Sequence, residues 1–206
     1  MRRRAWLVAF GAAFGAATLS VSGCAPATPT ALPSMPPSIA PSTAPSTATM
    51  SVVDVDLDAS LLDVLPTSID GQPRRPDDPT AIEIARNGNL GPDIEAIAMG
   101  LYVAAGSSAS QDLAIVNVVR LRSGAFSEAW YRDWRTTYDS GACEIAGGVA
   151  PGAAQSRIGD HDTDIGTCQG GVHTYHVHLT GPDRVVSITA AGDGRYGELV
   201  VKGLTE

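Results

Sequence analysis

The chain has 206 residues, 44% of them hydrophobic, and 22 acidic against 14 basic side chains give a formal net charge of −8 at pH 7. An acidic chain is repelled by nucleic acid and by anionic lipid surfaces. The charge therefore argues against a nucleic-acid partner and is compatible with a soluble domain that binds cations or cationic ligands.

The N-terminus has the pattern of an export signal. Arg2, Arg3 and Arg4 precede residues 5–19, which are apolar and carry no charge. Because a membrane-spanning helix needs about 20 apolar residues, this stretch is short for a span and typical of a signal peptide. If the three arginines leave with the signal, 11 basic side chains remain against 22 acidic ones, and the net charge becomes −11.

The signal ends in Val21-Ser22-Gly23-Cys24, an aliphatic residue, two small residues and a cysteine. This tetrapeptide resembles the lipobox of bacterial lipoproteins. The resemblance covers the signal alone and implies a signal peptide over residues 1–23, cleavage before Cys24 and acylation of its thiol with chains such as palmitate. Several acyl chains anchor a protein stably, because each buried methylene contributes about 0.8 kcal/mol. We therefore expect a protein on the outer side of the cell membrane, in the cell envelope, with the membrane as one partner.

Residues 24–50 are expected to form the anchor cysteine and a disordered tether. Residues 25–50 carry no charge, consist almost wholly of Ala, Pro, Ser and Thr, and include seven prolines. Such a composition favours extended segments and cannot build a core. Residues 51–206 remain, and their number is typical of one extracytoplasmic domain with its own core.

Three short helices are expected before residue 98, with an extended segment at 67–70. Each helix is marked by a start signal, an aspartate that can cap it or a proline at its first position. The starts are Asp58, Asp78-Pro79 and Gly91-Pro92-Asp93. The apolar residues that follow them are Leu61, Leu62 and Leu65, then Ile82 and Ala85, then Ile94 and Ile97.

Two strands and a long helix are expected next. Residues 99–105 and 113–122 read as strands, and the second is apolar on both faces, which is typical of a central strand. Residues 123–140 predict a helix that ends at Gly141. Its aromatic side chains recur at helical spacing and are expected to pack on the sheet, with an aromatic-ligand site as the alternative: Phe126, Trp130 and Trp134.

The rest of the chain predicts a meander of short strands and a closing helix. The expected strands are 156–158, 164–168, 172–179 and 184–191, and the helix is 196–204. This order favours an α+β domain in which an antiparallel sheet of about five to six strands carries one long helix and several short ones. Residues 192–197 match Gly-x-Gly-x-x-Gly, but too few residues follow for a dinucleotide-binding unit, so we interpret the match as a turn.

Cys143 and Cys168 remain once Cys24 is assigned to the anchor. Two cysteines in an exported domain are expected to form a disulfide. Closing the loop between them contributes roughly 3.5 kcal/mol in the chain-entropy model.

His173, His176 and His178 lie on one predicted strand, and alternation places His176 and His178 on the same face. On a solvated face such a pair can bind zinc or copper, with His161 or Asp162 from the adjacent hairpin as further ligands. The carboxylates of residues 160–164 alternate as in a calcium loop, although Ile165 and Gly171 depart from that pattern. The simpler interpretation is a row of polar residues in water.

The sequence contains no standard catalytic motif. A lipid-anchored, non-enzymatic domain that binds a partner protein or a small ligand, without a cofactor, is therefore the first hypothesis. A metal-binding protein or enzyme that uses the histidines and a divalent ion is the alternative. A hydrolase triad of scattered serine, histidine and aspartate stays open.

Overall fold

The computed structural model describes residues 55–86, 90–105, 112–144, 146–181 and 183–206. All of them belong to one compact unit, Ala48–Glu206. The predicted signal, Cys24 and the tether lie outside the described residues. In the part of the chain that is described, no helix is long and apolar enough to cross a bilayer.

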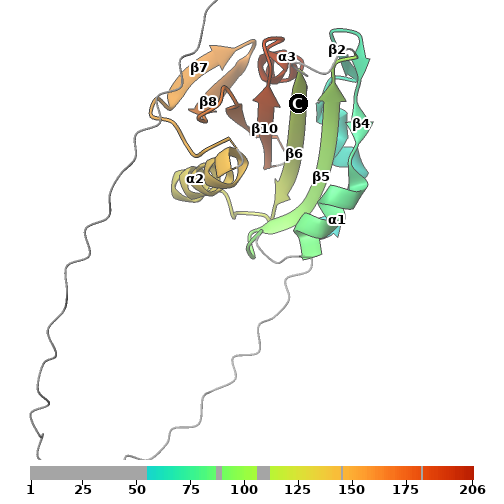
Figure 1. Cartoon of the computed structure of the whole chain (residues 1–206). Helices are drawn as coiled ribbons and strands as arrows, with labels where there is room; N and C mark the ends of the chain where they lie inside the picture. Colours follow the sequence, from blue (N-terminus) through green and yellow to red (C-terminus); the bar gives the residue numbers. More distant parts are fainter. Residues whose placement is uncertain (1–54, 87–89, 106–111, 145, 182) are drawn as a thin grey trace, which may run out of the picture. The chain divides into compact units, whose positions relative to one another are not determined.

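The centre of the domain is an eight-stranded sheet of order β1-β5-β6-β10-β9-β8-β7, with β4 also paired to β5 (Figure 1). Among the described strands of this sheet, only β1 and β5 pair in parallel, and the other neighbours are antiparallel. The strands are β1 (Asp56–Leu57), β4 (Arg75–Pro76), β5 (Ile94–Val103), β6 (Leu113–Leu121), β7 (Ala154–Ile158), β8 (His161–Thr167), β9 (His173–Leu179) and β10 (Arg184–Ala191). A small hairpin, β2 (Ser68–Ile69) and β3 (Gln72–Pro73), forms a separate two-stranded sheet.

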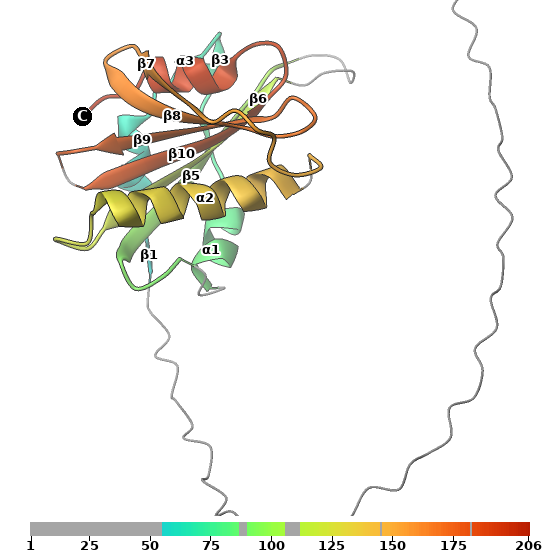
Figure 2. The same ribbon diagram turned by 90° about the vertical axis from the view of Figure 1, so that its left-hand side faces the viewer.

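Helices cover both faces of the sheet, as Figure 2 shows. The 3₁₀ helix η1 (Ala59–Val64) and α3 (Tyr196–Lys202) pack on one face. The helices α1 (Asp78–Arg86) and α2 (Glu128–Glu144) pack on the other. Asp58 caps η1 as its sequence position predicts, because its carboxylate accepts the Ser60 backbone N–H at 3.0 Å.

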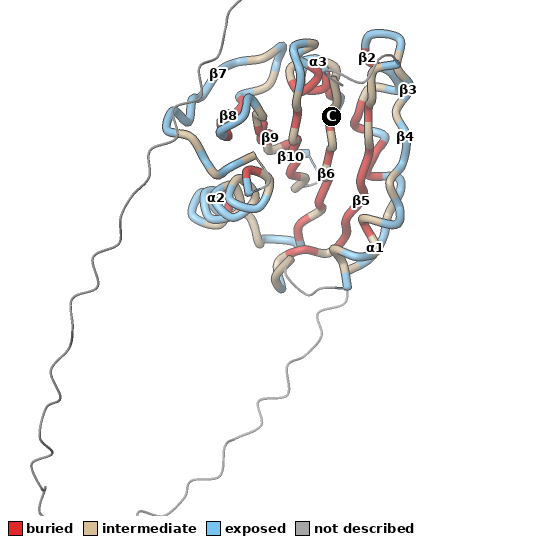
Figure 3. The backbone as a smooth tube through the Cα atoms, viewed as in Figure 1, coloured by how far each residue is buried: buried red, intermediate tan, exposed pale blue. Residues whose placement is uncertain are grey.

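The two faces carry cores of different size. The face under η1 and α3 holds a large apolar cluster to which β6 contributes Ala114, Val116 and Val118. The face under α1 and α2 holds a smaller cluster to which β6 contributes Val119 and Leu121. Burial follows this arrangement: β5 and β6 are largely buried, whereas α2 is mostly exposed or half-buried (Figure 3). The prediction of a central strand at residues 113–122 is confirmed.

The predicted α+β class with a mostly antiparallel sheet is confirmed, but the sheet has eight strands instead of five to six. The difference includes β1 and β4, two-residue strands that complete the sheet beside β5. Segments so short carry no periodic pattern, and their pairing depends on the neighbouring strand.

The predicted helix through Ile94 and Ile97 is wrong, because both residues lie in β5. The register of β5 against β6 shifts between Ile94 and Ala96, which marks a β-bulge. The extra residue places Ile94 and Ile97 in the same core cluster although they are three positions apart. The bulge thus reproduces in a strand the apolar spacing of a helix.

The helix predicted over residues 123–140 is present but begins and ends later, as α2 (Glu128–Glu144). Ser127 caps it, since its hydroxyl accepts the Trp130 backbone N–H at 3.1 Å. Gly141 does not end the helix and lies one turn before its end. The helix therefore extends to Cys143.

The glycines of residues 192–197 are explained by packing. The Asp112 carboxylate accepts the Gly194 backbone N–H at 2.7 Å, and a side chain at Gly192 or Gly194 would overlap Asp112. A side chain at Gly197, in α3, would overlap the buried Tyr175 ring of β9. These glycines therefore allow the backbone to approach Asp112 and Tyr175 closely.

We predict that Gly197→Ala destabilises the domain by about 1–3 kcal/mol, because the added methyl forces the Tyr175 ring out of the core. Urea unfolding followed by circular dichroism measures the loss. Gly181→Ala is the control, since a side chain there meets open space. Equal midpoints for the two variants would contradict this account of α3 packing.

Candidate ligand-binding site

A disulfide between Cys143 and Cys168 ties the end of α2 to the sheet. Both residues are buried, and their Cα atoms are 5.0 Å apart. Cys143 belongs to the last turn of α2, and Cys168 follows β8 directly. The predicted disulfide is thus confirmed, and it fixes the C-terminal end of α2 in place.

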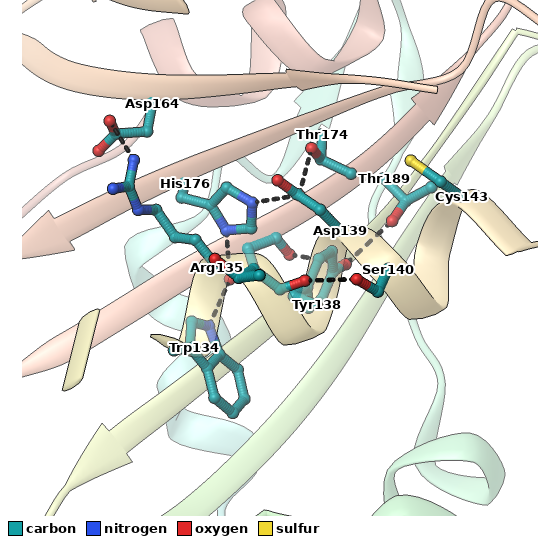
Figure 4. A network of polar contacts seen from close by, with 12 residues as sticks. Trp134, Arg135, Tyr138, Asp139, Ser140, Cys143, Asp164, Thr174, His176 and Thr189 are labelled. Atoms are coloured by element: carbon teal, nitrogen blue, oxygen red, sulfur yellow. Dashed lines mark hydrogen bonds and ion pairs between the residues drawn. The ribbon is translucent and has the colours of Figure 1, made fainter. Parts of the chain in front are cut away.

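Trp134 and Tyr138, which precede the C-terminal end of α2, are held by hydrogen bonds from the sheet-facing side of the helix to β10. The Trp134 indole Nε1 donates to the Ser187 hydroxyl at 2.9 Å. The Tyr138 hydroxyl lies 3.1 Å from the Thr189 hydroxyl (Figure 4). Burial raises the pKa of Tyr138 to about 12, so its phenol is neutral at physiological pH. Each ring thus has one orientation over the sheet.

Asp139 of α2 bonds to two side chains of β9. Its Oδ1 accepts from the Thr174 hydroxyl at 2.6 Å and from His176 Nε2 at 2.9 Å (Figure 4). Burial by itself raises the pKa of Asp139, but these hydrogen bonds outweigh burial and hold that pKa below its usual value. The carboxylate is therefore ionised at neutral pH and anchors the middle of α2.

Ser187, His176 and Asp139 form a line of hydrogen bonds with the residue types of a hydrolase triad. The Ser187 hydroxyl lies 3.0 Å from His176 Nδ1, and His176 Nε2 faces Asp139. The ring nitrogens are used in the opposite sense to the serine-protease arrangement, in which Nε2 faces the serine. Ser187 is also fully buried, and its oxygen accepts the Trp134 N–H. A substrate cannot reach this hydroxyl, and the line serves to hold α2.

The expectation that His176 and His178 share one face is confirmed, but the expectation that this face is solvated is wrong. His176 is 1% exposed beneath α2, and both of its ring nitrogens have partners. The His178 ring stacks on Phe126, with centroids 3.6 Å apart. Burial lowers the pKa of His178, although Asp183 and Glu128 oppose that shift. The helix α2 covers the face of β9 that the sequence pattern predicted to be exposed to solvent.

The other predicted metal ligands do not join them. His161 Nε2 lies 3.3 Å from the Leu204 carbonyl oxygen. The Asp162 side chain is 88% exposed and pairs with Arg157 at 3.2 Å. The predicted acidic turn is largely strand, since β8 begins at His161. Within the described residues, no three His, Cys, Asp or Glu side chains are grouped to hold a metal ion.

A groove of about 710 Å³ lies on this face between α1 and α2. Contacts place α2 over β9 and β10, and α1 against β5 and β1, so that β6 lies between the two helices. The floor is formed by β5, β6 and β10, and the walls by the two helices and residues 90 and 91. The lining residues are Thr80, Ile84, Leu90, Gly91, Ile97, Met99, Ile115, Asn117, Trp130, Asp133, Trp134, Thr137, Tyr138, Gly141, Ala142 and Thr189.

The groove is mainly apolar, with an aromatic wall. The Trp130 and Trp134 rings stack with centroids 5.6 Å apart, and Tyr138 follows at 6.4 Å from Trp134. In the floor, the Asn117 Oδ1 is buried without a hydrogen-bond partner among the described residues. Asp133 carries the formal charge among the described lining residues. These features are typical of a small-molecule site.

A second hollow, of about 460 Å³, lies on the other flank of α2 and is lined by charged, polar and apolar residues. Two charge pairs cross it, Arg135 with Asp164 and Asp139 with His176, and Arg132 is a further charged lining residue. The groove between α1 and α2, which exposes apolar surface to water, is therefore the stronger candidate for binding.

The sequence indicated one wall of the groove and missed the rest. The aromatic stripe at residues 126–134 carried the alternative of an aromatic-ligand site, and two of its three residues line the groove. Ile84, Met99, Asn117 and Thr189 come from four separate elements, and strand alternation bears only on the last three of them. No local sequence pattern indicated which part of the sheet α2 leaves uncovered.

No protein-family model matches this chain. No curated protein and no solved structure matches it either. The function is therefore inferred from the geometry of these residues.

We predict that Asp139→Asn lowers the free energy of unfolding by about 1.5–3 kcal/mol at pH 7, because two hydrogen bonds lose their charged acceptor. The folded-state pKa is lowered, so the contribution is present above the unfolded value of about 3.9 and is lost as pH falls through the folded value. Chemical unfolding at pH 7 and at pH 3 measures both effects. Asp133→Asn, an exposed change on the same helix, is the control, and a similar loss in both variants would contradict the anchoring role.

Proposed function

We propose that this chain is an exported, lipid-anchored protein of the cell envelope whose domain binds a small, mainly apolar molecule without transforming it. The groove between α1 and α2 is the observation that carries the proposal. Its volume of about 710 Å³ lies within the range of about 300–1,000 Å³ that is usual for ligand pockets.

The fixed position of α2 supports a binding role. Association is weakened when side chains must be ordered on binding, at roughly 0.5–1.5 kcal/mol for each. Here Trp134 and Tyr138 are already held by Ser187 and Thr189. The aromatic wall therefore keeps its shape while the groove is empty.

The polar residues near the groove support binding over catalysis. Ser187 is buried beneath Trp134, and both ring nitrogens of His176 bond to neighbours in the fold. A nucleophile and a base must reach the substrate to act. The reactive residue types of this face are instead used to position α2.

The anchor gives the binding domain its place. A lipid on Cys24 and a tether over residues 25–50 would hold the domain near the membrane, facing away from the cytoplasm. The Cys143–Cys168 disulfide supports this placement, because disulfides persist in oxidising compartments. Such a protein would collect its ligand at the cell surface or in the envelope.

We predict that the neutral dye N-phenylnaphthylamine binds the protein and that Gly141→Trp weakens binding about tenfold or more, because the indole fills part of the groove. Gly141 lines the groove, and a side chain there meets open space. Dye fluorescence, excited where tryptophan does not absorb, measures the affinity.

Ser140→Trp is the matched control for this experiment. Ser140 is the neighbouring exposed residue of α2 and is not among the groove lining. We expect its affinity for the dye to equal that of the wild type. If both variants bind as the wild type does, or if the wild type does not bind, the groove is not a ligand site.

We predict that cells fed radiolabelled palmitate label the wild-type protein and do not label Cys24→Ala, because the thiol that accepts the lipid is gone. Immunoprecipitation and autoradiography measure incorporation. A double variant, Cys143→Ala with Cys168→Ala, is expected to keep the label. Label retained by Cys24→Ala would refute the anchor.

A further inference from the structure

The charge of the groove is uneven. Among the described residues that line it, Asp133 is the one with a formal charge at neutral pH. The remaining polar groups are hydroxyls and the Asn117 amide, since the raised pKa keeps Tyr138 neutral. A ligand in this groove therefore meets a negative charge at an apolar, aromatic surface.

The aromatic wall adds to that preference. Trp130, Trp134 and Tyr138 succeed one another along α2, with ring centroids 5.6 Å and 6.4 Å apart. The faces of aromatic rings are electron-rich and attract cations, and tryptophan does so most strongly. Walls of adjacent aromatic rings are a known means of binding ammonium and quaternary ammonium groups.

The net negative charge of the chain also favours a cationic ligand. The chain has a net charge of −8, or −11 without the three arginines of the predicted signal. A net negative charge raises the local concentration of cations and lowers that of anions. Affinity inside the groove and attraction from outside it therefore favour the same class of ligand.

We propose that the ligand of the groove is an apolar organic cation, an amine or quaternary ammonium with a compact hydrocarbon body. The body packs on the partly exposed Ile84, Leu90 and Ile115, while the cation lies against the Trp130–Trp134 wall within the field of Asp133. This inference rests on the proposed function and specifies its ligand.

The tryptophans provide a direct measurement. The chain has three, Trp6, Trp130 and Trp134, and the last two line the groove. In the full chain with Trp6→Phe, all tryptophan emission comes from the groove wall. Titration with adamantylamine, adamantanol and adamantanecarboxylate compares a cation, a neutral molecule and an anion that share one hydrocarbon body and do not fluoresce.

We expect adamantylamine to bind about tenfold more tightly than adamantanol, and the carboxylate to bind most weakly. Equal affinity for the amine and the alcohol, or tighter binding of the carboxylate, would overturn the assignment of a cation while leaving the groove as an apolar site. If none of the three binds and N-phenylnaphthylamine does not bind either, the proposed function fails as well.

The variant Asp133→Asn tests the source of the preference. We expect it to weaken adamantylamine binding about three- to tenfold and to leave adamantanol binding unchanged. Glu144→Gln is the matched control, because it removes the same charge from an exposed position of α2 that is not in the groove lining. Equal losses in the two variants would show that only net charge matters and would overturn the role of Asp133.

Discussion

The hydrogen bonds between Asp139 of α2 and Thr174 and His176 of β9 are the contact on which the rest of this face depends. A charged carboxylate that is largely buried is stable only when its oxygens are bonded, and Oδ1 has two donors. From His176 the line of hydrogen bonds continues through Ser187 to Trp134. The line places α2 over one half of the sheet, above β9 and β10, and fixes its rotation about its own axis.

That placement creates the groove. A row of register partners crosses the sheet on this face: Asp164, His176, Ser187, Asn117 and Met99. Side chains of α2 contact Asp164, His176 and Ser187 of this row, but α2 does not extend over Asn117 and Met99. Asn117 and Met99 are left as floor between α2 and α1, and Asn117 Oδ1 is left without a partner among the described residues. The site is thus the part of the sheet that its helices do not cover.

Sequence patterns predicted the elements that repeat and missed those that depend on distant partners. The two-faced pattern of residues 113–122 identified a central strand, and two cysteines in a chain with the pattern of an export signal predicted the disulfide. The bulge between Ile94 and Ala96 gave a strand the spacing of a helix, so local periodicity failed there. His176 looked like a solvated ligand because its partner, Asp139, lies 37 residues away on another element. Alternation gives the face of a side chain but not what covers that face.

The disulfide connects the fold to the proposed location of the protein. Tyr131 and Cys143 are the buried residues of α2, whereas Trp130 and Trp134 are only partly buried against the core. The helix therefore depends on polar contacts and on the Cys143–Cys168 bond. In a reducing compartment the bond would be lost, and the end of α2 that carries Gly141 and Ala142 of the groove would be released. An exported protein can use such a lightly buried helix as a rigid wall, because its surroundings keep the disulfide oxidised.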